Sequence, residues 1–114
     1  MKIDYNERRF KIVQTLGSGE LDPNQIFVYR QEGEMLTCSY TGKGILKGHI
    51  LGKVDPKDGS LVFTYHQLND RGELSSGICR STPTFSESQK IILHEQWEWL
   101  SGKKGVGESI LEEI

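Results

Sequence analysis

Apolar and polar residues alternate along most of the chain. An alternation with period two places successive side chains on opposite faces of a β-strand. The alternating runs are rich in β-branched and aromatic residues, which favour strands. The pattern predicts eight strands, at about residues 7–15, 25–31, 34–41, 45–54, 60–69, 73–81, 89–100 and 106–113.

Turn-forming residues separate these runs. Gly, Asn, Asp and Pro supply the backbone angles that tight reversals need, and they gather in GSGELDPN (17–24), EGE (32–34), TGKG (41–44), DPKDG (55–59), NDRG (69–72), STPTFSES (81–88) and SGKKG (101–105). Most of these links are too short for a crossover helix, so neighbouring strands should be antiparallel. One stretch with helical character, LDPNQIF, is too short to change the class.

The strand pattern predicts an all-β protein with one domain over residues 1–114, an eight-stranded antiparallel up-and-down barrel. Closing the meander removes both exposed sheet edges. Eight strands leave room inside for side chains or for one small ligand. A two-sheet sandwich is the structural alternative, but its Greek-key connections are usually longer than the links seen here.

Hairpins fix which side chains point inward. We interpret EGE as a two-residue turn with Glu32 and Gly33 at its tip, which places one larger and more aromatic set inside: Phe27, Tyr29, Gln31, Leu36, Cys38 and Tyr40. On the next strand the apolar or small set is Leu46, Gly48, Ile50, Gly52 and Val54. Glycine is costly inside a strand, so Gly48 and Gly52 indicate a sharp bend or room left for a large side chain or ligand.

The remaining strands follow the same logic. Their predicted inward residues are Phe63, Tyr65 and Gln67, then Ser75, Gly77, Cys79 and Ser81, then Ile91, Leu93, Glu95, Trp97 and Trp99. For the second of these strands the opposite register would bury Arg80 with Ile78, so we prefer the register that leaves Arg80 in solvent. The last strand stays open between two sets: Gly107, Ser109 and Leu111, or Val106, Glu108 and Ile110.

Glu95 is the most informative residue, because its carboxylate shares the inward face of IILHEQWEW (91–99) with two tryptophans. An ionised carboxylate buried without partners costs several kcal/mol. It must therefore be partnered, protonated or open to a cavity. Inward tyrosines and glutamines are the available partners, or else they line a pocket around it. The predicted ligand-binding residues are Tyr29, Gln31, Tyr40, Tyr65, Gln67, Glu95 and Trp97.

Composition and motifs narrow the function. A formal net charge of -2 gives no general attraction to nucleic acid or anionic membranes. The sequence shows no apolar membrane span and no signal peptide, so we expect a cytoplasmic protein. His49, His66 and His94 fall on the outward parity, which argues against a metal site. No cofactor-binding loop is present, and no cofactor is predicted.

Two cysteines, Cys38 and Cys79, match no metal or redox motif. We expect both to be small buried side chains rather than a disulfide, since no export signal precedes them. A nucleophilic Cys79 would need a base on its own face, and no histidine lies there. The catalytic residues, if any, stay unknown.

Several motifs together carry a resemblance to a known group: YRQEG, YTGKGI, LHEQWEW followed by SGKKG, and SILEE. They resemble small bacterial proteins of about this length that are often called N-acetylglutamate synthase. An acetyltransferase of that class needs an α/β fold with a coenzyme A pyrophosphate loop, so the all-β pattern does not support that activity. The resemblance covers residues 9 to 114 and implies a calycin-like barrel, lipocalin- or avidin-like, although the Gly-x-Trp of classical lipocalins is absent. Its matching positions are Tyr29, Gln31, Tyr40, Gly42, Gly44, Tyr65, Gln67, Gly77, Cys79, Ser81, Glu95, Trp97, Trp99 and Glu112.

Three functions remain open. The leading hypothesis is a barrel that binds a small polar or amphiphilic ligand, because aromatic walls with a few polar groups suit such a molecule. The second is an enzyme that uses Glu95 as acid or base in the same cavity, and the sequence favours it less. The third is a structural or interaction domain with a filled barrel, monomeric or a homodimer through outward residues that include Val28, Met35, Val62, Ile92 and Leu100.

Overall fold

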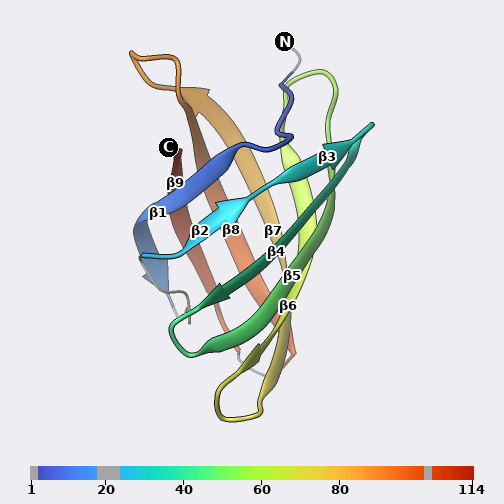
Figure 1. Ribbon diagram of the computed structural model, residues 1–114, viewed down its shortest axis with the longest axis vertical. Helices are drawn as coiled ribbons and strands as arrows, with labels where there is room; N and C mark the ends of the chain where they lie inside the picture. The colour runs from blue at the N-terminus through green and yellow to red at the C-terminus, as the bar shows by residue number, and fades with distance from the viewer. Residues whose placement is uncertain (1–2, 18–23, 102–103) are drawn as a thin grey trace.

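A computed structural model describes residues 3–17, 24–101 and 104–114, in which one antiparallel sheet rolls into a nearly closed barrel (Figure 1). Its strands are β1 (Arg9–Gly17), β2 (Ile26–Val28), β3 (Arg30–Glu32), β4 (Met35–Gly42), β5 (Ile45–Val54), β6 (Leu61–Asn69), β7 (Leu74–Phe85), β8 (Ile91–Ser101) and β9 (Val106–Glu113). The all-β antiparallel barrel is as predicted. Within the described residues, no helix has the length and apolar character of a membrane span.

The predicted strand 25–31 is divided into β2 and β3, which accounts for nine strands where eight were predicted. Tyr29 lies at the break, and its backbone N–H donates to Arg8 O (2.9 Å) while its carbonyl accepts from the N–H of Glu7 (2.8 Å). The chain therefore changes partner at this residue, because β2 pairs with β1 and β3 pairs with β4. The two outermost strands of the sheet are thus consecutive pieces of one segment, and this brings the barrel close to closure.

Two turn predictions need correction. Glu32 pairs with Met35, so the tip of the EGE turn is Gly33 and Glu34 rather than Glu32 and Gly33. Gly33 has a φ of 61°, which glycine tolerates best. Because the register moves by two residues, the same side chains still face inward. The helical character predicted in LDPNQIF and the turns GSGELDPN and SGKKG fall partly or wholly outside the described residues.

STPTFSES is the second correction, because β7 continues through it to Phe85. Beyond Ser81, β7 has only β8 as its partner, since β6 begins opposite Ser81 at Leu61. Pro83 is therefore tolerated, because its missing N–H breaks no ladder on that side. The reversal itself lies over 86–90, where Ser86 N–H donates to Lys90 O (2.9 Å).

The inward sets are confirmed with one exception. Leu46, predicted inside, is 57% exposed, and Ile45 is buried in its place. An irregularity in the β5 ladder between Ile45 and Lys47 shifts the alternation by one residue there. The register of β7 is the one that leaves Arg80 exposed, and β9 turns Ser109 and Leu111 inward.

Glycines give the interior aromatic rings their space. Three large side chains lie directly opposite glycines on the neighbouring strand: Tyr40 opposite Gly48, Tyr65 opposite Gly77, and Trp97 opposite Gly107. A Cβ added at any of these glycines would overlap the facing ring. The rings therefore lie against the barrel wall instead of standing into the interior. Gly48 was predicted to leave room of this kind, and Gly52 likewise faces Phe63.

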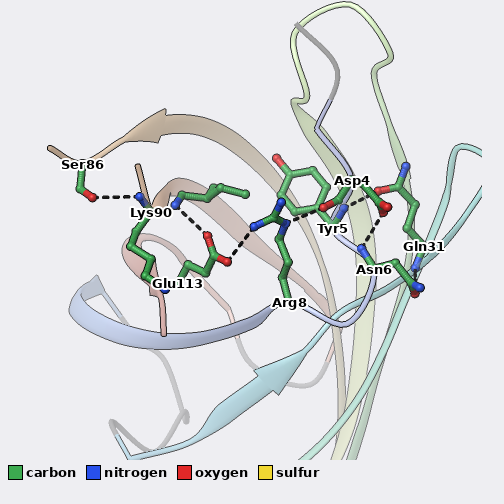
Figure 2. Close-up of polar contacts among 9 residues, drawn as sticks. Asp4, Tyr5, Asn6, Arg8, Gln31, Ser86, Lys90 and Glu113 are labelled. Carbon is green, nitrogen blue, oxygen red and sulfur yellow. Dashed lines mark hydrogen bonds and ion pairs between the residues drawn. The ribbon is translucent and has the colours of Figure 1, made fainter. Parts of the chain in front are cut away.

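Residues 3–8 close one end of the barrel, which we call the capped end (Figure 1). Tyr5 is fully buried, and its hydroxyl donates to Gly59 O (2.5 Å) in the turn between β5 and β6. Its N–H donates to Oε1 of Gln31, and Arg8 reaches Glu113 on β9 at 2.8 Å (Figure 2). Most of the deeply buried apolar side chains lie toward this end, including Phe10, Leu36, Leu61, Ile91 and Leu93.

Candidate ligand-binding cavity

The opposite half of the interior, which we call the aromatic end, begins at the middle of the barrel and contains a cavity of about 40 Å³. Space of this size holds a few water-sized groups. The cavity is lined by Phe27, Tyr29, Tyr40, Ile50, Phe63, Tyr65, Gln67, Cys79, Glu95, Trp97, Trp99 and Leu111. These residues come from seven of the nine strands, all but β1 and β3, and from the break between β2 and β3, so most of the barrel contributes to one interior site.

Glu95 lies at the middle of β8 and is only 7% exposed. The registers pair it with Ser81 on β7 and with Ser109 on β9. Its Oε2 atom is buried and has no hydrogen-bond partner, and the same holds for Oγ of Ser81. Two adjacent strands thus present two unsatisfied polar atoms, which is uncommon in a folded interior.

The polar side chains around Glu95 form hydrogen bonds elsewhere. Tyr40 donates its hydroxyl hydrogen to Oε1 of Gln67 at 2.8 Å. Trp97 donates its indole N–H to Oγ of Ser109 at 3.0 Å. The Tyr65 hydroxyl is directed to the backbone carbonyl oxygen of Glu98, at 3.5 Å. None of these neighbours donates a hydrogen bond to Oε2 of Glu95. The Glu95 carboxylate is therefore not fully paired to protein groups.

Burial raises the pKa of Glu95 to about 8, an effect that a hydrogen bond from the Cys79 thiol only partly offsets. The pKa values of the acidic groups around Glu95 are raised as well. Burial, and then the Glu95 charge, raise the pKa of Cys79 well above its usual value. Burial also raises the pKa of Tyr29 and Tyr65, with Glu95 among the further causes. Below its pKa, the Glu95 carboxyl is neutral and keeps an O–H to donate.

No lysine, arginine or histidine belongs to the described lining of the cavity. His49 and His66 lie on β5 and β6 with ring centroids 6.0 Å apart, away from the lining residues. Within the part of the chain that the structure describes, no group of three or more His, Cys, Asp or Glu side chains could hold a metal ion. Cys38 and Cys79 are both buried free thiols.

Six of the seven predicted ligand-binding residues line the cavity: Tyr29, Tyr40, Tyr65, Gln67, Glu95 and Trp97. Gln31 does not, because it shares the inward parity but lies at the capped end. There its amide bonds to Tyr5 N–H and to the carbonyl of Gly33. The prediction did not name the other six lining residues, because it weighed polar groups above the apolar walls around them: Phe27, Ile50, Phe63, Cys79, Trp99 and Leu111.

Comparison with known proteins places the chain in a family. Residues 3–114 match the model of a family described as Avidin-like protein. No curated protein and no solved structure matches the chain.

Proposed function

The chain belongs to the avidin-like protein family, and we propose that its barrel binds a small molecule in the cavity around Glu95. Barrels of this family typically bind small ligands such as biotin. The observation that carries the proposal is the buried, unpartnered Oε2 of Glu95 beside a cavity. A protein gains nothing in stability from such a group, whereas a ligand that hydrogen-bonds to it gains affinity and orientation.

The walls support the same role. Aromatic rings surround the site, with Tyr65 and Trp99 centroids 5.3 Å apart and Trp97 and Trp99 centroids 6.2 Å apart. A mostly apolar lining with few polar groups is typical of small-molecule sites. Because these rings lie against glycines on neighbouring strands, the interior is shaped to keep a space open rather than to fill it.

The chain's two tryptophans, Trp97 and Trp99, both line the cavity, so intrinsic fluorescence reports on this site. We expect native mass spectrometry of protein from its source to show a bound small molecule. A library of metabolites of mixed charge should contain members that shift the tryptophan emission in a saturable way. Protein with no bound molecule, and no saturable response to any compound, would contradict the proposal.

Two substitutions on the same strand sharpen the test. Glu95→Gln keeps the shape of the side chain and removes its charge, so binding should weaken about tenfold or more if the carboxyl anchors the ligand. Glu98→Gln makes the same chemical change on the outward face and should leave binding unchanged. Equal affinities of both variants and the unaltered protein would remove Glu95 from the site.

A second candidate is acid–base catalysis by Glu95 in the same cavity. A carboxyl with a pKa of about 8 exchanges protons near neutral pH, as a general acid or base must. An enzyme of this kind would convert a metabolite of the library, with Glu95→Gln inactive and Glu98→Gln active. Binding without any turnover would leave the binding role alone.

Assembly and location are tested separately. Proteins of this family often form oligomers, and Met35 and Leu100 are outward apolar residues that are 47% and 59% exposed. We propose a homodimer or a monomer, which light scattering distinguishes.

We also propose a cytoplasmic location, supported by the free thiols of Cys38 and Cys79. Cell fractionation tests it, and recovery outside the cytoplasm would contradict it.

A further inference from the structure

The environment of Glu95 lacks positive charge. Four other titratable groups interact with it: Tyr29 at the break between β2 and β3, Cys38 on β4, Tyr65 on β6 and Cys79 on β7. All four are acids that burial keeps neutral, and none supplies a counter-charge. Among the described lining residues there is likewise no cation. The cavity thus contains one carboxyl, several neutral groups and nothing to balance an ionised Glu95.

We propose that the cavity binds a compact primary ammonium ion, with Glu95 as its counter-charge and the aromatic rings as its walls. This inference rests on the proposed function and names the chemical class of the ligand. An ammonium nitrogen brings the positive charge and the N–H donors that this part of the interior does not have. A carboxylate ligand would meet Glu95 as a like charge and is disfavoured.

Hydrogen bonding fits this class of ligand. An ammonium group has three N–H donors, and Oε2 of Glu95 is a buried acceptor without a partner. Oγ of Ser81, on the strand paired with Glu95, is a second buried oxygen without a partner. Ser81 does not line the cavity, so the charge-assisted bond to Glu95 is the contact that holds the ammonium group. The neighbouring indole N–H of Trp97 cannot supply a hydrogen bond to Glu95 instead, because it is already bonded to Ser109.

The walls also favour a cation. Trp97, Trp99 and Tyr65 form a continuous set of edge-packed rings beside Glu95. The faces of such rings attract a cation within about 6 Å of the centroid, and tryptophan does so most strongly. A cavity of about 40 Å³ admits only a short apolar body behind the nitrogen. A two- to four-carbon alkylammonium is therefore a suitable probe.

Binding of this ligand changes the protonation of Glu95. Below its pKa the carboxyl carries a proton, and a bound ammonium ion favours the ionised form. The proton then passes to the buffer, so one proton leaves for each cation bound. Affinity should rise about tenfold per pH unit on the acid side of the Glu95 pKa, and level off above it.

The experiment titrates the protein with n-propylammonium chloride, propan-1-ol and sodium propionate, which share a three-carbon chain and differ in charge. Tryptophan fluorescence reports binding, and calorimetry in two buffers of different ionisation enthalpy counts the protons released. We expect propylammonium to bind at least about tenfold more tightly than propanol, and propionate not to bind. Proton release at pH 6 should approach one per site, and Glu95→Gln should abolish both the preference and the release.

Glu98→Gln serves as the matched control and should behave like the unaltered protein. If propanol or propionate binds as well as propylammonium, or if no proton is released, the ammonium inference fails. The proposed function then still stands, because a small molecule is bound. If propylammonium gives no signal while a neutral or anionic library compound binds, the inference also fails alone. If no compound of any charge binds, both fail together.

Discussion

The capped end and the aromatic end of the barrel are built from the same strands, yet they differ in chemistry. At the capped end, Tyr5, Leu36 and Leu93 are fully buried. The Tyr5 hydroxyl and N–H both have partners there. At the aromatic end, Glu95 keeps an oxygen without a partner, and glycines hold the neighbouring rings against the wall. One end is filled and satisfied, and the other contains open space and an unbalanced acid.

The difference shows how one strand can serve two purposes. β8 starts at the capped end with Ile91 and Leu93, which pack in the core. It continues through Glu95 to Trp97 and Trp99, which line the cavity. Since alternation fixes only the face, position along the strand decides whether an inward residue stabilises the fold or shapes the site. The capped half can therefore supply the stability that an unsatisfied carboxyl removes.

The largest effect should come from the pH dependence of Glu95. Its pKa is about 8 in the folded protein against an ordinary 4.5, so between these values the folded state holds a proton that the unfolded state has lost. The contribution of Glu95 to the free energy of unfolding should therefore be fully present below about pH 4.5 and be lost as pH rises to about 8, by on the order of 5 kcal/mol. Urea denaturation across this range measures the loss.

Glu95→Gln has no proton to lose at this position, so the pH dependence of stability that Glu95 causes should disappear. Above pH 8 the variant should therefore be more stable than the unaltered protein. The outward Glu98→Gln is its control and should keep the slope of the unaltered protein. Parallel pH profiles for Glu95→Gln and the unaltered protein would mean that Glu95 ionises freely in the fold, and the contrast between the two ends would lose its main support.

The next effect belongs to the capped end. Tyr5→Ala removes a fully buried ring that packs near Phe10 and Tyr29, with centroids 6.3 and 6.2 Å away. The loss of apolar burial and the resulting cavity should cost roughly 3 kcal/mol of unfolding free energy. Tyr5→Phe should cost only about 1 kcal/mol, for the bond to Gly59. If Tyr5→Ala leaves the free energy of unfolding unchanged, residues 3–8 do not close the barrel.

The smallest effect tests the glycines of the aromatic end. Gly48→Ala should cost roughly 2 kcal/mol, because its Cβ would overlap the ring of Tyr40. In a Tyr40→Ala background the same change should cost much less, and the difference is the coupling in a double-mutant cycle. Ser39→Ala, on the outward face of β4, should change stability by less than about 0.5 kcal/mol. Additive costs for Gly48 and Tyr40 would refute the close approach.

The sequence predicted the inward face well because a period of two is a local property. Glu95, Tyr40 and Gln67 could be placed inside from their own strands and the hairpins beside them. The alternation misled only at Leu46, because a ladder irregularity changes the parity without a clear change in composition. Gln31 was placed on the correct face, yet it bonds to Tyr5 at the capped end.

Other features depend on long-range geometry that no local pattern carries. The break at Tyr29 arises because residues 7 and 8 bond to its backbone. The N-terminal cap forms because Tyr5 reaches a turn 54 residues away. Oε2 of Glu95 lacks a partner because Tyr40 and Trp97 direct their donors to Gln67 and Ser109, and rotamers of this kind follow from packing in three dimensions.

The pairing of β1 with β9 has a consequence for synthesis. Phe10 on β1 lies opposite Glu113 on β9. During synthesis, β1 is the first of the described strands to leave the ribosome and β9 is the last, so β1 remains without this partner until β9 has been made. The meander from β4 to β8 forms from neighbours, and contacts between neighbours form early. Until β9 arrives, β1 and β8 each present an open edge, which is the kind of edge that recruits other chains. A nascent chain of this barrel is therefore most vulnerable to aggregation just before it is complete through β9.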